Sequence, residues 1–280
     1  TDSIGLGLNF GFPSGETQRI NVGGLVEYTD ITEGAFPAQE VSEFIEKNGN
    51  TSYNYKLNLS WSSSTLNRGP FPTRGRSQSL GMEVAIPGSD LQFYKLFYNG
   101  QIFFPLADRW TVRVRTELGS GDGYGDTEAL PFYEHFFAGG FGSVRGFESN
   151  SLGPRSTPPV VDINGNPIAQ SFFDDDQDPF GGNLLVEGSI ELIFPLPFIE
   201  NTTQFRPVLF VDAGNVFNTD CPDVSTVCDG LDFGLIRYSA GVSVTWITGL
   251  GPMTFGLAKA YNVGEFDEEE FFQFELGRTF

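Results

Sequence analysis

The sequence predicts an all-β fold, a transmembrane antiparallel β-barrel of which about 11 strands are present. Segments of about ten residues alternate apolar and polar side chains, which is the period of a strand with two different faces. Short turns alternate with longer, acidic loops between these segments, as in barrels of the bacterial outer membrane. Aromatic residues make up 15% of the chain and glycine 35 of its 280 residues, which favours strands and turns over helices.

The first two strands form a predicted hairpin. Residues 3–12 alternate apolar with small or polar side chains without a break, and residues 19–29 alternate again after a tight turn at 13–16. The polar segment 31–50 follows, in which we expect one helical turn around residues 41–45.

Four more strands precede the central loop. Their apolar faces lie within residues 53–61, 80–86, 94–104 and 110–118. In the third of these, Phe93, Phe97 and Phe103 occupy the polar face and blur the pattern.

Five further strands follow the central loop. We expect them at about residues 183–194, 203–217, 236–247, 252–262 and 270–280. In a membrane barrel the apolar face of each strand meets lipid and the polar face lines the lumen. Aromatic girdle residues are expected near the strand ends, namely Tyr28, Trp61, Trp110, Trp246 and Tyr261. A soluble antiparallel sandwich also alternates, but it would rarely place basic residues at successive alternate positions opposite such aromatic faces.

The number of strands is odd, which bears on domain organisation. Single-chain bacterial barrels have an even number of strands, with both ends on the periplasmic side. We therefore expect residues 1–280 to be a single C-terminal portion of a larger barrel domain whose earlier strands precede Thr1. A closed barrel of eleven strands is the disfavoured alternative.

Charge and cysteine content restrict the possible partners and compartment. The net charge is -20, which argues against nucleic acid as a partner because phosphate contacts need lysine and arginine. Cys221 and Cys228 lie in a polar loop, where a small disulfide in an oxidising compartment is favoured over free thiols. A zinc site is not expected, because two cysteines and the lone His135 do not supply four ligands.

The longest connection, residues 120–182, is the expected functional region. A connection of this length without regular structure is either functional or disordered. Its first half carries glycines and aromatics around a single arginine, in the run Val144, Arg145, Gly146 and Phe147. This composition is unlike that of a flexible linker.

Several stretches resemble the BamA family of outer-membrane protein assembly factors. The matching segments are residues 66–73, 86–90, 131–134, 139–153 with the Val144–Phe147 core, 181–183 and 272–280. They occur in order along nearly the whole chain. The resemblance implies a barrel of sixteen strands behind periplasmic POTRA domains, so that five strands and those domains would be absent here.

The resemblance implies that Arg145 folds back into the lumen and meets acidic residues of the following strands. Strand parity places Glu191 on the polar face of its strand, and Asp212 on the same face as Arg206. A guanidinium between two carboxylates would hold a long loop whose ordering is otherwise unfavourable. We interpret Arg145, Glu191 and Asp212 as a structural clamp; the alternative is a solvated loop arginine.

The last strand carries a second expected site. Phe272, Phe274, Leu276 and Phe280 share one face, and Gly277 would weaken and bend the strand. The strand resembles the sorting signal of barrel clients. In the family it pairs poorly with the first strand, which gives a lateral gate where a client strand can add. An ordinary closing strand is the alternative.

Other features carry weaker signals. Residues 161–167 predict a small hairpin with an Asn–Gly turn. The acidic run 174–178 lacks the spacing of a calcium loop and is interpreted as solvated. The sequence offers no set of nucleophile, base and orienting acid, so we expect no enzyme activity, no catalytic residue, no metal and no cofactor.

The leading functional hypothesis is an insertase of the bacterial outer membrane. The expected partners are unfolded barrel clients, assembly lipoproteins, and outer-membrane lipid with lipopolysaccharide. One alternative is a relative from two-partner secretion or the translocation-and-assembly branch, which upstream POTRA domains would distinguish. Another is a passive outer-membrane pore, which steady ion-selective conductance would reveal.

Overall fold

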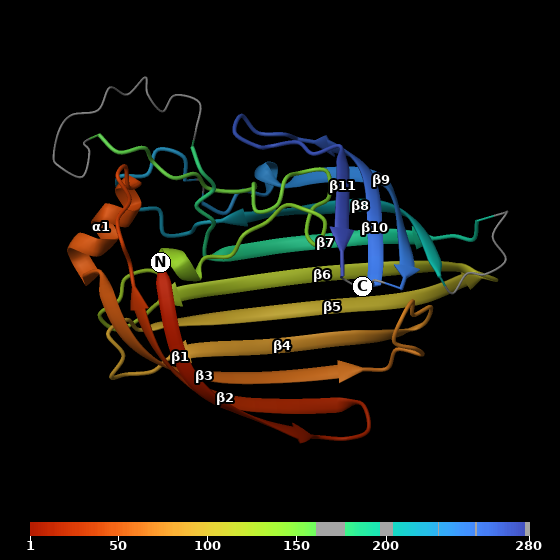
Figure 1. The fold of residues 1–280 in the computed structure, drawn as a ribbon, viewed down its shortest axis with the longest axis horizontal. Coiled ribbons are helices and arrows are strands. Elements are labelled where there is room, and N and C mark those ends of the chain that lie inside the picture. The colour runs from red at the N-terminus through yellow and green to blue at the C-terminus, as the bar shows by residue number, and fades with distance from the viewer. Residues whose placement is uncertain (161–176, 197–203, 229, 250, 278–280) are drawn as a thin grey trace.

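Eleven strands form one antiparallel sheet in which each strand pairs with its neighbours in sequence order. The computed structural model describes residues 1–160, 177–196, 204–228, 230–249 and 251–277. Figure 1 shows the sheet curving around the loops that lie on its concave side. The strands are β1 (Asp2–Pro13), β2 (Gln18–Asp30), β3 (Thr51–Ser64), β4 (Gly75–Ala85), β5 (Phe93–Ala107), β6 (Trp110–Gly123), β7 (Leu184–Ile193), β8 (Phe205–Phe217), β9 (Arg237–Thr248), β10 (Gly251–Tyr261) and β11 (Phe272–Leu276). The predicted all-β fold is confirmed, and the single sheet rules out the two-layered sandwich.

The two faces of the sheet differ as the alternation predicts. Apolar side chains on the convex face remain exposed, with 83% of Leu6 and 59% of Ile190 accessible. Alternate residues point inward, and in β8 these are buried from Arg206 to Asp212. An extensive exposed apolar face on a sheet whose other face is polar is the pattern of a wall that contacts lipid.

The buried core lies between the concave face and the loops. Phe93 and Phe103, which blurred the strand pattern, point inward and are 0% and 2% exposed. Phe93 packs with Leu91 and Leu130 of two loops, whereas Phe103 packs with residues of β7, β8 and β10. Their position on the otherwise polar face therefore reflects contacts inside the barrel.

Two element boundaries differ from the predictions. The expected helical turn is a ten-residue helix, α1 (Gln39–Asn48), whose buried Glu40 accepts hydrogen bonds from the backbone N–H of Thr157 and from Ser225. These contacts come from distant loops, so local sequence could not reveal them. Strand β11 ends at Leu276, because Gly277 adopts a φ of +92° that departs from strand geometry, and residues 278–280 of the predicted strand lie outside the described residues.

Short one-turn 3-10 helices add little to the framework. They are η1 (Phe132–Glu134) in the central loop and η3 (Phe233–Leu235) before β9. Of the helices within the described ranges, none has both the length and the apolar character needed to cross a membrane.

A matched pair of substitutions in β3 tests the assignment of the two faces. Leu57 lies on the convex face and is 51% exposed, whereas its neighbour Asn58 points inward. We expect Leu57→Arg to lower the free energy of unfolding in lipid vesicles by about 2–4 kcal/mol, because it places a charge in hydrocarbon. Asn58→Arg is the control and should cost much less. If urea unfolding of the complete protein shows that both variants lower the free energy of unfolding equally, the assignment of the two faces is contradicted.

Candidate functional site

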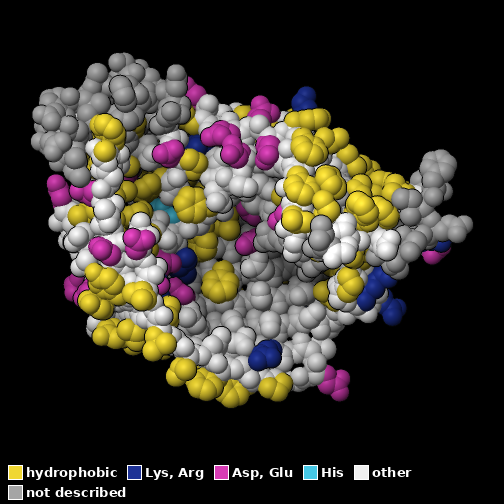
Figure 2. Space-filling model, viewed as in Figure 1, with side chains coloured by type: hydrophobic (Ala, Val, Ile, Leu, Met, Phe, Trp, Pro, Cys, Tyr) yellow, Lys and Arg dark blue, Asp and Glu magenta, His cyan; other side chains and the backbone are white. Residues whose placement is uncertain are grey.

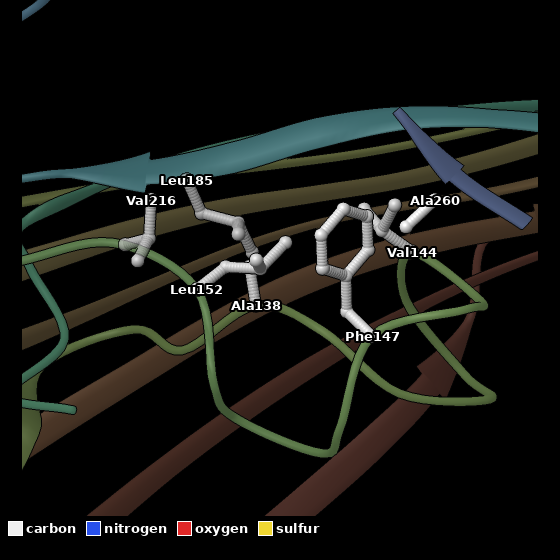
Figure 3. Close-up of a cluster of buried hydrophobic side chains, with 7 residues drawn as sticks. All are labelled: Ala138, Val144, Phe147, Leu152, Leu185, Val216 and Ala260. Carbon is white, nitrogen blue, oxygen red and sulfur yellow. The ribbon is translucent and has the colours of Figure 1, made fainter. Parts of the chain in front are cut away.

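The central loop lies on the concave side of the sheet. Seven apolar side chains form its buried contact, and Figure 3 shows loop residues facing residues from three strands. Val144, Phe147 and Leu152 of the loop are each 0% exposed. Burial of a side chain as large as phenylalanine contributes about 1.5–3 kcal/mol. The full set is Ala138, Val144, Phe147, Leu152, Leu185, Val216 and Ala260.

Gly146 allows the loop to turn against the sheet. Its φ is +88°, a region that residues with a Cβ rarely adopt. A Cβ at this position would lie 3.0 Å from the Cβ of Ala258 and 3.4 Å from that of Ser239. Both the backbone conformation and the close approach to β9 and β10 therefore require glycine next to Arg145.

Arg145 lies between two carboxylates of the barrel wall. Its Nε and Nη2 donate to Asp212 at 2.7 and 2.8 Å, and its Nη2 lies 2.9 Å from Glu191. The backbone N–H of Arg145 also donates to Asp212, at 3.1 Å. Ser189 accepts from Nη2 and donates to Asp212. The guanidinium carbon lies 3.5 Å above the ring of Phe210.

The charged groups of this ion pair are buried, so they depend on one another for stabilisation. Arg145 is 2% exposed, Glu191 3% and Asp212 0%. Burial alone would lower the pKa of the guanidinium, but Asp212 and Glu191 raise the pKa above its ordinary value. A buried charge without a partner is strongly unfavourable, so the charge of Asp212 depends on Arg145, and Glu191 adds a second carboxylate beside the same guanidinium. The structure thus brings together the three predicted residues and places the arginine out of solvent.

Two further arginines of β6 take part in this network, and the sequence analysis did not single them out. Arg113 donates to Glu191 at 3.1 Å, and the two residues are cross-strand neighbours. Arg115 donates to the carbonyl oxygens of Gly142 and Ser143, the latter at 2.8 Å. Alternation placed both arginines on the polar face, but only the strand register shows which groups they meet.

The loop is also tied to the last strand. Gln273 of β11 is 3% exposed; its Oε1 accepts from the N–H of Gly146 at 3.1 Å, and its Nε2 donates to the carbonyl of Phe147 at 2.7 Å. Just before β11, the N–H of Glu270 donates to the carbonyl of Gly146 at 2.9 Å. The arginine motif and the terminal strand therefore share direct hydrogen bonds.

A second charged cluster anchors the start of the loop. Glu134 of η1 lies 2.5 Å from Lys56 of β3 and 3.0 Å from Lys95 of β5. Lys56 also pairs with Glu27 of β2, at 2.6 Å. Burial would raise the pKa of the Glu134 carboxyl, but Lys95 and Lys56 hold the pKa below its ordinary value. Sequence analysis missed this cluster because nothing local pairs an acid of the loop with lysines about 40 and 80 residues earlier.

The terminal-strand residues lie at the exposed face of β11. Phe272, Phe274 and Leu276 are 54%, 48% and 58% exposed, and Phe274 packs against Phe255 of β10. Phe280 lies outside the described residues, as do the predicted hairpin at 161–167 and residues 174–176 of the acidic run.

The two cysteines and the single histidine have local structural contacts. Cys221 and Cys228 form a disulfide in the loop after β8. His135 lies against Phe180, whose carbonyl is 3.0 Å from Nδ1, and burial lowers the pKa of the imidazole. Within the described ranges, no cluster of three or more histidine, cysteine or acidic residues is arranged to hold a metal ion.

Comparison with known proteins defines the class. The model of the Omp85 superfamily domain matches residues 1–280, and the chain belongs to this superfamily. Within it, the chain is 34% identical to the outer membrane protein assembly factor BamA of Neisseria meningitidis, across 100% of this chain and 36% of that protein. The chain thus spans about a third of the length of this relative.

Two other matches support the same fold. The crystal structure of BamA from Haemophilus ducreyi lacking POTRA domains 1–3 aligns with a TM-score of 0.79 and 29% identity, over 97% of this chain and 53% of that one. A SAM50-like protein of Schizosaccharomyces pombe is 25% identical over 70% of this chain and 37% of its own length. The resemblance to BamA inferred from the loop and strand motifs is therefore confirmed.

Substitution of Arg145 tests the clamp. Arg145→Ala should lower the free energy of unfolding of the complete protein by about 3–5 kcal/mol, because it leaves the buried Asp212 without its cation, whereas Glu191 keeps Arg113. Arg145→Lys should recover only part of this loss, since an ammonium cannot form the bidentate contact. Arg74→Ala, at an exposed turn position, is the control. If urea unfolding shows that Arg145→Ala lowers the free energy of unfolding no more than Arg74→Ala does, the clamp interpretation is contradicted.

The Glu134 cluster gives a pH-dependent prediction. Because its folded-state pKa is depressed, Glu134 stabilises the fold above its unfolded pKa of about 4.3, and this contribution is lost as pH falls through the lower folded value. Glu134→Gln should therefore reduce thermal stability at pH 7, with the difference from wild type shrinking below about pH 4. Glu16→Gln in an exposed turn is the control. A difference independent of pH would refute the ionic role.

Proposed function

We propose that this chain is the part of an outer-membrane insertase that folds and inserts β-barrel proteins into the bacterial outer membrane. The observation that carries the proposal is the loop anchored on both sides, to the barrel wall through Arg145 and to the terminal strand through Gln273. Membership of the Omp85 superfamily and similarity to a protein named as an assembly factor support it.

In this proposal the arginine motif is a structural clamp with no chemical role. The ion pairs offset the entropy of ordering a long loop and fix the loop inside the lumen. Val144 and Phe147 add buried apolar contacts on either side of Arg145. The loop then supports the wall of β7 and β8 from inside the lumen, and the insertion of client proteins takes place elsewhere on the barrel.

We assign the lateral gate to the terminal strand. Strand β11 is five residues long and pairs with β10 in the described part of the chain, in a register from Leu257–Phe272 to Met253–Leu276. A short strand that ends at Leu276, just before Gly277, has few hydrogen bonds to lose. A client strand would add at this edge by strand augmentation, which uses backbone hydrogen bonds for affinity. Gln273 would transmit the position of the strand to the arginine loop.

The proposed partners follow from this activity. They are unfolded barrel proteins, assembly lipoproteins, and the lipid and lipopolysaccharide around the convex face. We propose no cofactor and no covalent chemistry. The proposed location is the outer membrane of a bacterial cell, with the acidic long loops outside.

Two alternatives make different predictions. A two-partner secretion or translocation-and-assembly protein would share the arginine loop, and the number and sequence of upstream POTRA domains would separate it from an insertase. A passive pore would show large, steady, ion-selective conductance in single-channel recordings, and its depletion would leave other barrels unaffected.

A reconstitution experiment tests the insertase proposal. The complete protein in lipid vesicles should accelerate the folding of an added unfolded barrel protein, measured as protease-protected folded client. Gln273→Leu should slow this reaction while leaving the protein folded, because it removes the two side-chain hydrogen bonds between loop and gate. Asn58→Leu, on the inner face of β3, is the control. Wild-type protein that gives no acceleration over empty vesicles would contradict the proposal.

A further inference from the structure

A cavity at the turn end of the barrel contains a buried arginine. The cavity, here called the turn-side pocket, has a volume of about 240 Å³ and lies between the β3–β4 turn, the start of β6, the end of β7 and the start of β8. Arg206 of β8 lines it and is 4% exposed. Among the described residues, neither Nη1 nor Nη2 of Arg206 has a hydrogen-bond partner.

The nearby acids of the loop network are already paired. Glu191 contacts Arg113 at 3.1 Å and Arg145 at 2.9 Å, and Asp212 binds Arg145. What Arg206 has instead are aromatic faces, with its guanidinium carbon 5.5 Å from the ring of Phe71 and 5.2 Å from that of Phe103. Such stacking uses the face of the guanidinium and leaves its N–H edge available.

A buried cation without an anion is costly, which suggests that an anion completes the site. Buried charges are normally paired, and burying one alone is strongly unfavourable. Two exposed arginines, Arg68 and Arg109, also line the pocket, so its mouth is positive. Figure 2 shows the same polarity, with acidic side chains gathered toward the long-loop end and a group of basic side chains at the turn end.

The other walls of the pocket are apolar. Phe71, Phe194 and Phe205 line it together with prolines from two turns. Phe71 has a φ of +53°, which is rare for a bulky residue, and its carbonyl accepts from Nε of Arg68 at 2.5 Å. The backbone is thus held so that one aromatic ring contacts Arg206. A ligand must therefore bring a negative group and an apolar group together.

We propose that the turn-side pocket binds a carboxylate of an unfolded polypeptide that lies next to an aromatic side chain. This inference rests on the proposed function, which brings such polypeptides to the turn end of the barrel. A lipid phosphate is disfavoured because Arg206 points inward with Phe210 and Asp212, on the face opposite to lipid. The carboxylate can be a chain end or an aspartate or glutamate side chain.

Three short peptides separate these sources. The first is N-acetylated and ends in phenylalanine with a free carboxylate, the second is its C-terminal amide, and the third is an amide that carries aspartate beside phenylalanine. Binding to the complete protein in detergent micelles is measured by calorimetry. We expect the first peptide to bind about tenfold to a hundredfold more tightly than the second, the range for one charged hydrogen-bonded contact. Equal binding of the third peptide would assign the site to side-chain carboxylates as well.

Two variants identify the residue responsible. Arg206→Met should abolish the preference for the carboxylate peptides, while its unfolding temperature without peptide stays equal to or above that of wild type, because an unpaired buried charge has been removed. Arg74→Gln, on the same turn end but outside the pocket, should keep the preference. The comparison of the first two peptides uses wild-type protein alone, so it decides the question even if Arg206→Met does not fold.

Three results would overturn the proposal. They are equal binding of all three peptides, an unchanged preference in folded Arg206→Met, and Arg206-dependent binding of inorganic phosphate without binding of any carboxylate peptide. The proposed function fails separately. If the protein binds the carboxylate peptides through Arg206 but does not accelerate client folding, the pocket proposal stands and the insertase proposal is contradicted. If it accelerates client folding but does not bind the peptides, only the pocket proposal is contradicted.

Discussion

The buried ion pair of Arg145 with Asp212 and Glu191 is the interaction on which the rest of the interior depends. Charges buried to 2%, 0% and 3% exposure are tolerated because each lies beside an opposite charge. Because Arg145 belongs to a loop and its partners to β7 and β8, satisfying these charges also fixes the path of the loop. The apolar contacts of Val144 and Phe147 follow from that path, as do the hydrogen bonds to Gln273.

The described interior contains buried charged groups as well as buried apolar contacts. Charged groups come in connected sets, with Arg113 and Arg145 sharing Glu191 on one side and Lys56 and Lys95 sharing Glu134 on the other. Each set links a loop to the wall. Arg206, whose Nη1 and Nη2 have no hydrogen-bond partner among the described residues, stands outside both sets, which is why we assign it to a ligand and not to the loop framework.

Alternation along the strands was enough to predict the eleven strands and to place Glu191 and Asp212 on the inner face, because a period of two fixes the side of every residue in a strand. It could not predict which inner residues meet, since that depends on register and on the path of the loop. Arg113, Gln273 and the Lys56–Glu134 pair were therefore missed. The extent of α1 was underestimated because its anchor, Glu40, binds residues more than a hundred positions away.

The central claim is that Arg145 and Asp212 act as one unit, and a double-mutant cycle tests it most directly. The free energy of unfolding of the complete protein in lipid vesicles is measured for wild type, Arg145→Met, Asp212→Asn and the double variant. Our account predicts that the double variant loses about as much free energy of unfolding as the worse single variant, because removing either partner already breaks the contact between them. Losses that simply add would contradict it and would leave the loop without its proposed anchor.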